Sequence, residues 1–265
     1  MLGERQKDDR VKRLLGEAGL RLLEQARVAV VGVGGVGSYA VEALARAPVR
    51  HLLLVDPDRV AVSDINRQLH ATHATIGKPK VEVMCERVRA INPEAEAVGV
   101  FCRLTAANAA EIIGSEPTWV IDAIDDPVAK VALLAHCVAA RIPVVSSMGA
   151  AGRLDPGRIM VDDISVTRVC PLARRLRKAL RQHGIESGIR VVYSTEEPIV
   201  AQAGFVTDPP GERRPQPTIS YLPAAFGLHC AAVVIRSLLD GLYLRRRGEG
   251  AVADADAVGE QCERT

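Results

Sequence analysis

The sequence is poor in aromatic residues, has no closely paired cysteines and carries almost no net charge. Phe, Trp and Tyr make up 3% of the 265 residues, which leaves little material for a platform on which nucleic-acid bases could stack. The six cysteines are Cys85, Cys102, Cys137, Cys170, Cys230 and Cys262, and no two lie within four residues of each other. This spacing excludes a CxxC redox motif and a zinc ribbon. We therefore expect free thiols in a reducing, cytoplasmic environment.

The formal net charge of +2 gives no overall reason to expect nucleic-acid binding, so any such contact must be local. The first ten residues, MLGERQKDDR, are too charged for a signal peptide. The longest apolar run covers residues 221–235, includes Pro223 and ends at Arg236, a length that we interpret as too short to cross a bilayer. We therefore expect no membrane association.

A glycine-rich motif stands near the start of the chain, in VAVVGVGGVGSYAVEALA at residues 28–45. Branched apolar residues run into four glycines, Gly32, Gly34, Gly35 and Gly37, and an amphipathic stretch follows. This pattern predicts a buried strand, a tight turn and a helix whose N-terminal N–H groups can bind a phosphate.

An acidic residue follows the next predicted strand, as expected for a nucleotide site. Residues 51–55 are apolar and end at Asp56, 19 residues after Gly37, where a carboxylate can bind ribose hydroxyls. We predict that the chain binds a nucleotide here. The alternative is a glycine turn that only packs a helix on the sheet.

Strands and helices alternate up to about residue 150, which predicts an α/β fold with a doubly wound, mostly parallel sheet. In that half we expect strands at 97–102, 119–124 and 143–147 and helices at 80–91, 108–113 and 127–140. Beyond it we expect strands at 159–164 and 190–194, a basic helix at 172–183, a surface loop at 201–219 and an apolar helix at 226–244. These elements suggest a nucleotide-binding, Rossmann-type domain at 1–165, an α/β extension of the same fold at 166–247 and a disordered tail at 248–265.

Charged side chains gather at the predicted strand ends. The segment 64–68, DINRQ, lies in a long polar loop, GKPK follows at 77–80, and Asp122, Asp125 and Asp126 end or follow a buried strand. An open α/β sheet binds ligands at this edge. Fixed cations there would hold phosphate oxygens, and a carboxylate would hold Mg²⁺. Together these groups point to adenylation chemistry.

These motifs resemble the E1-like superfamily of adenylating enzymes, the ThiF/MoeB/HesA group. The resemblance rests on GVGGVG, LLLVDPD, SDINRQ, GKPK and VIDAIDD and covers about residues 10–165. It implies that Asp56 binds the ATP ribose, that Asn66, Arg67 and Lys80 contact phosphates, and that Asp125 holds Mg²⁺. The implied nucleotide site comprises Gly32, Gly34, Gly35, Gly37, Asp56, Asp58, Asn66, Arg67, Gln68, Lys80 and Asp125.

Arg13 matches an arginine that this family donates across a homodimer interface into the partner's ATP site, so the resemblance implies a homodimer. Each assignment has a plainer alternative. Arg67 and Lys80 could be ordinary loop cations, and Arg13 could be a charge on an exposed helix. Asp122 lies inside the buried-looking run WVIDAI, and we favour a hydrogen-bonded structural acid there.

Within the superfamily, the chain is similar to the tRNA threonylcarbamoyladenosine dehydratases of the TcdA/CsdL type. The likeness includes INRQLHA, KVEVMCERVRAINPE, DPGRIMVDDIS and PLARRLRKALR and extends to about residue 198. It implies that ATP adenylates the threonine carboxylate of the modified adenosine at position 37 of tRNA, whereupon that modification cyclises. It also suggests a sulfur-transfer partner protein and a monovalent cation, Na⁺ or K⁺, near residues 155–157 or the later strand.

A basic helix supports an RNA substrate independently. Five cations stand within eight residues and no acid interrupts them: Arg174, Arg175, Arg177, Lys178 and Arg181. Such a strip could neutralise several phosphates, although a solvated helix face is the alternative.

Three other readings of the sequence remain. The chain could adenylate the C-terminus of a ubiquitin-like sulfur carrier, but the paired zinc cysteines usual in those enzymes are missing. Cys170 could be a catalytic thiol, but no histidine stands beside it as a base. Finally, a protein that binds NAD without adenylation would leave Arg67, Lys80 and Asp125 without a role.

Overall fold

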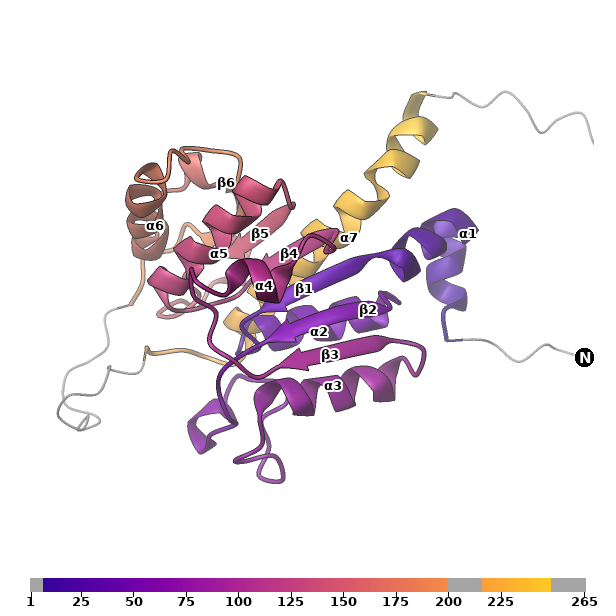
Figure 1. Ribbon diagram of the computed structural model, residues 1–265, viewed down its shortest axis with the longest axis horizontal. Helices are drawn as coiled ribbons and strands as arrows, with labels where there is room; N and C mark the ends of the chain where they lie inside the picture. Colours follow the sequence, from indigo (N-terminus) through magenta and orange to yellow (C-terminus); the bar gives the residue numbers. More distant parts are fainter. Residues whose placement is uncertain (1–6, 200–215, 249–265) are drawn as a thin grey trace, which may run out of the picture.

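The computed structural model of the chain describes residues 7–199 and 216–248 (Figure 1). Most of the predicted surface loop at 201–219 and nearly all of the predicted tail at 248–265 therefore lie outside the described residues.

In the described part of the chain, seven strands form one sheet in the order β3-β2-β1-β4-β5-β7-β6. The strands are β1 (Arg27–Val31), β2 (His51–Val55), β3 (Glu96–Val100), β4 (Trp119–Asp122), β5 (Val144–Ser147), β6 (Ile159–Asp163) and β7 (Arg190–Ser194). All neighbours are parallel except β6, which runs antiparallel to β7. The predicted doubly wound, mostly parallel sheet is confirmed. Because β7 lies between β5 and β6, the sheet is continuous across residue 165.

Helices cover both faces of this sheet. The helices of the described residues are α1 (Asp9–Gln25), α2 (Gly37–Arg46), α3 (Lys80–Ile91), α4 (Ala109–Ile113), α5 (Pro127–Ala140), α6 (Pro171–Arg181) and α7 (Tyr221–Gly248), and 3₁₀ turns stand at Val62–Asp64, Pro156–Arg158 and Ile164–Val166. Of these, α1 packs against α7 and not on a face of the sheet. One apolar core lies between the sheet and α2, α3 and α7, and a second lies between the sheet and α4, α5 and α6. In Figure 1, α2 and α3 lie below β1, and α4 and α5 lie above it.

The apolar run that begins at residue 221 lies in a longer helix than the sequence suggested. The segment Tyr221–Asp240 of α7 is long and apolar enough to cross a membrane, with a mean hydropathy of 1.7, so the expectation that the run is too short was wrong. Half of this segment is buried, and Leu222, Phe226, Cys230 and Val234 are fully enclosed in the core. The packing is so close that a Cβ on Gly227 would stand 2.2 Å from the Val36 carbonyl oxygen. Its apolar surface therefore packs against α2 and the sheet.

The strand order changes direction between β1 and β4, because β2 and β3 extend to one side and β5 and β7 to the other. At such a switch point the connections after neighbouring strands diverge and leave a crevice at the carboxyl edge. The glycine turn follows β1 at that edge. Its first amide, on Gly32, donates to the Val55 carbonyl of β2, and Ala123 after β4 donates to Val31. The turn is thus fixed between β2 and β4.

Candidate active site

The glycine turn after β1 is shaped by close backbone contacts. Gly32 has φ +86°, and a Cβ there would stand 2.6 Å from the Ala123 carbonyl oxygen. A Cβ on Gly37 would come within 1.8 Å of the Gly32 carbonyl oxygen, so only glycine lets α2 begin this close to β1. At Gly34, by contrast, the nearest atom to a Cβ would be Gln68 Nε2 at 3.8 Å. This middle part of the turn can therefore accept a ligand against bare main chain.

Asp56 follows β2 and is fixed by the same turn. Its Oδ2 accepts from the Val33 amide at 2.6 Å, and its Oδ1 accepts from the Asp58 amide at 2.9 Å. Burial raises the pKa of Asp56, and the nearby Lys80 ammonium opposes that shift. Each oxygen keeps a second lone pair that can accept a ribose hydroxyl.

The predicted phosphate cations converge on one carboxylate to which the sequence analysis gave no role. Asp64, almost fully buried, lies 3.3 Å from Arg67 Nη2 and 3.7 Å from Lys80 Nζ. It also accepts from Gln68 Nε2 at 2.7 Å. The ammonium of Lys80 reaches Asp58 Oδ2 at 3.1 Å as well. An acid three residues before Arg67 was the available signal for this role, since it can pair with that arginine within one turn.

The loop that carries these cations packs against the glycine turn. Arg67 Cγ would lie 3.3 Å from a Cβ on Gly35, so the arginine stem rests on the turn. Asn66 is exposed and accepts from Arg67 Nη1 at 2.9 Å. The structure thus brings Asn66, Arg67, Gln68 and Lys80 to the carboxyl edge beside the glycines, as the sequence analysis expected.

The three aspartates at and after the end of β4 lie in different environments. Asp122 is fully buried, accepts from Ser146 Oγ at 2.6 Å and lies 2.8 Å from Lys130 Nζ, so the interpretation as a structural acid is confirmed. Asp126 caps α5 by accepting from the Val128 amide at 2.8 Å. Asp125 stands between them and is exposed at the crevice. Lys130 is not predictable as the partner of Asp122, because a lysine in an apolar helix does not reveal its partner along the sequence.

Arg13 lies away from this edge of the sheet, and Cys170 lies beneath the surface. Arg13 is exposed on α1, which stands at the amino ends of the strands in Figure 1, so it does not reach the site of its own chain. Cys170 is 3% exposed, which leaves its sulfur little access to a substrate. The five described cysteines are all free thiols.

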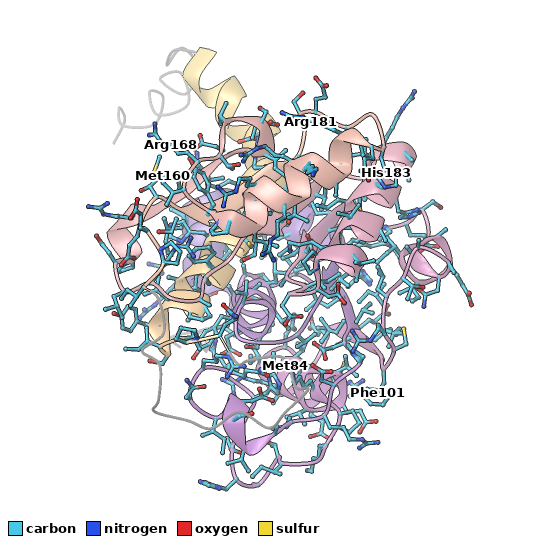
Figure 2. All side chains as sticks on the ribbon, turned by 90° about the vertical axis from the view of Figure 1, so that its left-hand side faces the viewer. Met84, Phe101, Met160, Arg168, Arg181 and His183 are labelled. Carbon is cyan, nitrogen blue, oxygen red and sulfur yellow. The ribbon has the colours of Figure 1, made fainter. Side chains whose placement is uncertain are left out.

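The basic helix α6 presents its cations unequally. Arg174, Lys178 and Arg181 are exposed and share one face, because they follow each other at intervals of four and three residues. Arg177 is partly buried and donates to the Thr167 carbonyl at 2.9 Å. Figure 2 shows α6 crossing the near side of the molecule, with Arg181 and His183 at its end.

Arg175 points to the other flank of α6. It borders a groove of about 590 Å³ between α5, α6 and residues 103–106, whose rim also carries Arg103 and His183. Asp126 lines the same groove, which therefore begins one residue from Asp125.

Two known proteins are similar in sequence to most of this chain. A tRNA threonylcarbamoyladenosine dehydratase of Bacillus subtilis is 38% identical over 239 residues, which cover 88% of this chain and 94% of the relative. The enzyme of that name from Escherichia coli is 41% identical over 206 residues, covering 75% and 77%.

The fold of this chain also matches a solved structure of the Escherichia coli dehydratase, TcdA, in complex with ATP. The TM-score is 0.82 at 35% identity, and the match covers 94% of this chain and 99% of that one. The sequence model of the ThiF family matches residues 8–260, which is nearly the whole chain. The chain therefore belongs to the ThiF family.

Proposed function

We propose that the protein is an ATP-dependent tRNA threonylcarbamoyladenosine dehydratase. The observation that carries the proposal is the pairing of a bare glycine turn with two cations, Arg67 and Lys80, held on one buried carboxylate at the same edge. The relatives named above, with the ATP complex among them, support the substrate and the nucleotide.

In this proposal the ATP ribose binds Asp56 and the phosphates lie over Gly34 and Gly35. Arg67 and Lys80 are the charges that stabilise the pentavalent α-phosphorus, because they are fixed before the nucleotide arrives. Their present partners, Asp64 and Asp58, keep them from swinging into solvent. Asn66 and Gln68 complete the wall of this pocket.

The residues at the crevice fit a magnesium ion that arrives with the nucleotide. Among residues 7–199 and 216–248, no three His, Cys, Asp or Glu side chains gather into a metal site. Magnesium commonly takes one or two carboxylates and completes its shell with phosphate oxygens and water. Asp125, exposed beside the turn, is the carboxylate that would hold it. When bound, the ion neutralises the departing pyrophosphate.

The substrate in this proposal is the threonine carboxylate of the modified adenosine at position 37 of tRNA. Its oxygen attacks the α-phosphorus, pyrophosphate leaves and an acyl-adenylate forms. The ureido nitrogen of the same modification then attacks the acyl carbon, a ring closes and AMP leaves with the oxygen. Because the substrate supplies both nucleophiles, no enzyme thiol takes part, in agreement with the burial of Cys170.

The remaining assignments are also proposals. We infer that the exposed cations of α6 contact tRNA phosphates, that Arg13 enters the partner's site in a homodimer, and that the enzyme works in the cytoplasm. A monovalent cation near residues 155–157 and a sulfur-transfer partner protein stay predictions from the family resemblance.

The proposal is tested by AMP release from Mg-ATP with purified protein. We expect release that requires tRNA bearing threonylcarbamoyladenosine and that is absent with tRNA lacking the modification. Release that instead required a small protein ending in Gly-Gly would overturn the proposal and establish a sulfur-carrier adenylyltransferase.

A further inference from the structure

A fully buried lysine holds the backbone from which Asp125 projects. Lys130 lies on α5 one turn after the helix begins, and its side chain is 0% exposed. Its ammonium lies 2.8 Å from Asp122 Oδ2 and donates to the Ile124 carbonyl at 3.0 Å. The residue thus contacts both the end of β4 and the residue directly before Asp125.

The peptide groups of this short turn are bound on both sides. The Ile124 amide donates to Asp122 Oδ1 at 3.2 Å, which is the hydrogen bond of an Asx turn. Ser146 on β5 donates to the other carboxylate oxygen of Asp122 at 2.6 Å. Lys130 donates to the Ile124 carbonyl, so side chains from both β5 and α5 hold this turn in place.

The same turn forms a wall of the phosphate site. A Cβ on Gly32 would lie 2.6 Å from the Ala123 carbonyl oxygen, so residues 123–125 pack directly against the glycine turn. A shift of residues 123–125 would therefore move both the carboxylate of Asp125 and the floor beneath the phosphates.

Stability alone is a poor reason for this arrangement. Bringing two charges out of water costs free energy that their attraction often fails to exceed, and apolar residues of similar size commonly stabilise a core as well or better. An apolar side chain could not bind the Ile124 carbonyl. That contact is what Lys130 adds beyond packing.

We propose that Lys130 is a positioning residue that sets the Ile124–Asp125 backbone and thereby the affinity for magnesium-bound ATP. The role in the nucleotide site rests on the proposed function, whereas the effect on the backbone does not. Lys130 itself touches neither the nucleotide nor the metal.

The test compares three variants by hydrogen exchange and by calorimetry. Lys130→Met alone leaves Asp122 without its buried counter-ion and is expected to fold poorly. The double variant Lys130→Met/Asp122→Asn removes both charges and keeps a side-chain carbonyl oxygen for the Asx turn. Its effect therefore reports the loss of the lysine's contacts with the Asp122 and Ile124 backbone carbonyls. Leu134→Ala, one turn further along α5 and fully buried, creates a cavity in the same helix without touching that contact and serves as the control.

In the nucleotide-free protein we expect the double variant to exchange amides of residues 123–126 about tenfold faster than the wild type, as for loss of one strong hydrogen bond. With nucleotide, we expect Mg²⁺ to tighten ATP binding by about tenfold less than in the wild type, while ATP alone binds within about threefold. Leu134→Ala lowers the melting temperature but keeps the wild-type response to Mg²⁺.

Unchanged exchange in the double variant would overturn the positioning role, as would an unchanged Mg²⁺ response. A wild-type protein that binds no ATP would instead overturn the proposed function. The hydrogen-exchange result would still decide whether Lys130 positions the backbone.

Discussion

At the residue scale, the site depends on arginine and lysine charges fixed in advance. Arg67 donates from Nη1 to the Ser63 carbonyl at 2.8 Å and lies against Asp64, so its guanidinium has a defined position before ATP binds. A preset charge stabilises a transition state without reorganising first, which is the largest contribution in many enzymes.

We therefore predict that Arg67→Ala lowers tRNA-dependent AMP release by about 10²- to 10³-fold, the usual effect of removing one such donor. Arg59→Ala is the matched control, because Arg59 stands in the same loop but donates to the Gly77 carbonyl. The rates are measured under saturating tRNA. A loss of only a few-fold in Arg67→Ala, equal to that of the control, would remove Arg67 from the phosphate site.

His70 gives the loop an acid-sensitive stability. It is 3% exposed, neither ring nitrogen has a hydrogen-bond partner among the described residues, and burial together with Lys80 lowers its pKa to about 4. The unfolded chain therefore binds a proton near pH 6.5 that the folded chain resists. The stability from the neutral ring is complete above that value and is lost as the pH falls toward 4.

We predict that this residue accounts for about 3 kcal/mol of the decrease in unfolding free energy between pH 7 and pH 4. Chemical denaturation of wild type and His70→Gln at several pH values measures the difference. His73→Gln, on an exposed position of the same loop, should behave as the wild type. Parallel pH curves for wild type and His70→Gln would contradict the prediction.

The spacing of residues predicted Asp56 and the glycines, because residues that directly follow a parallel strand lie at the carboxyl edge of the sheet. The phosphate role of Lys80, which begins α3, came from the family resemblance. The spacing could not predict Asp64 or Lys130 in their roles. Their partners come from a loop folding back on itself and from a helix facing a strand end, and neither pairing is visible along the chain. Such contacts are decided by tertiary packing.

At the element scale, the bounds of β2, β7, α3 and α5 agree with the sequence prediction, because apolar periodicity and end signals coincide there. Strand β4 ends two residues early at Asp122, although the apolar pattern continues to Ile124. There the chain turns on the Asp122 carboxylate instead of pairing with β5. Helix α7 begins earlier than expected, since Pro223 is tolerated in a first turn.

From the exposed cations on one face of α6 we predict a salt-dependent contact with RNA. We expect Arg174→Ala/Lys178→Ala to weaken tRNA binding and to reduce the slope of log affinity against log salt by about 1.5 to 2, because each cation releases roughly one counterion. Fluorescence titration over a range of salt concentrations measures this slope.

The control removes the same charge elsewhere. Arg27 and Arg46 are exposed at the start of β1 and on α2, so Arg27→Ala/Arg46→Ala changes the net charge equally but not this helix. Equal slopes for the two double variants would show that α6 is a solvated face.

At the scale of the whole molecule, the family resemblance predicts a homodimer with a shared active site. Arg13 lies on α1, and α1 stands at the amino ends of the strands, opposite the glycine turn, so in such a dimer the turn would receive the arginine of the partner. In a homodimer, Arg13→Ala and Arg67→Ala then disable each site from different chains.

We predict that an equal mixture of these two inactive variants, after subunit exchange, regains about a quarter of the wild-type AMP release, because half of the dimers carry one intact site. Either variant alone stays inactive. A mixture that remains inactive, or a wild type that sediments as an active monomer, would exclude the shared site.

The order of the strands was the part of the architecture that the linear pattern could not supply. Strand β7 enters between β5 and β6, and β6 turns antiparallel at the edge. Alternating strands and helices predict the class of sheet. They do not predict that β7 pairs with β5 while β6, which comes before it in the sequence, forms the edge.

The close packing of α7 on the glycine turn has a consequence for synthesis. The Val36 carbonyl and Gly227 meet in the finished protein, yet Val36 leaves the ribosome about 190 residues before its neighbour. Until then the apolar side of α2 lacks its cover, and a nascent chain in this condition is a natural client for chaperones. Because two segments about 190 residues apart must meet, closure is a long-range and therefore slow step.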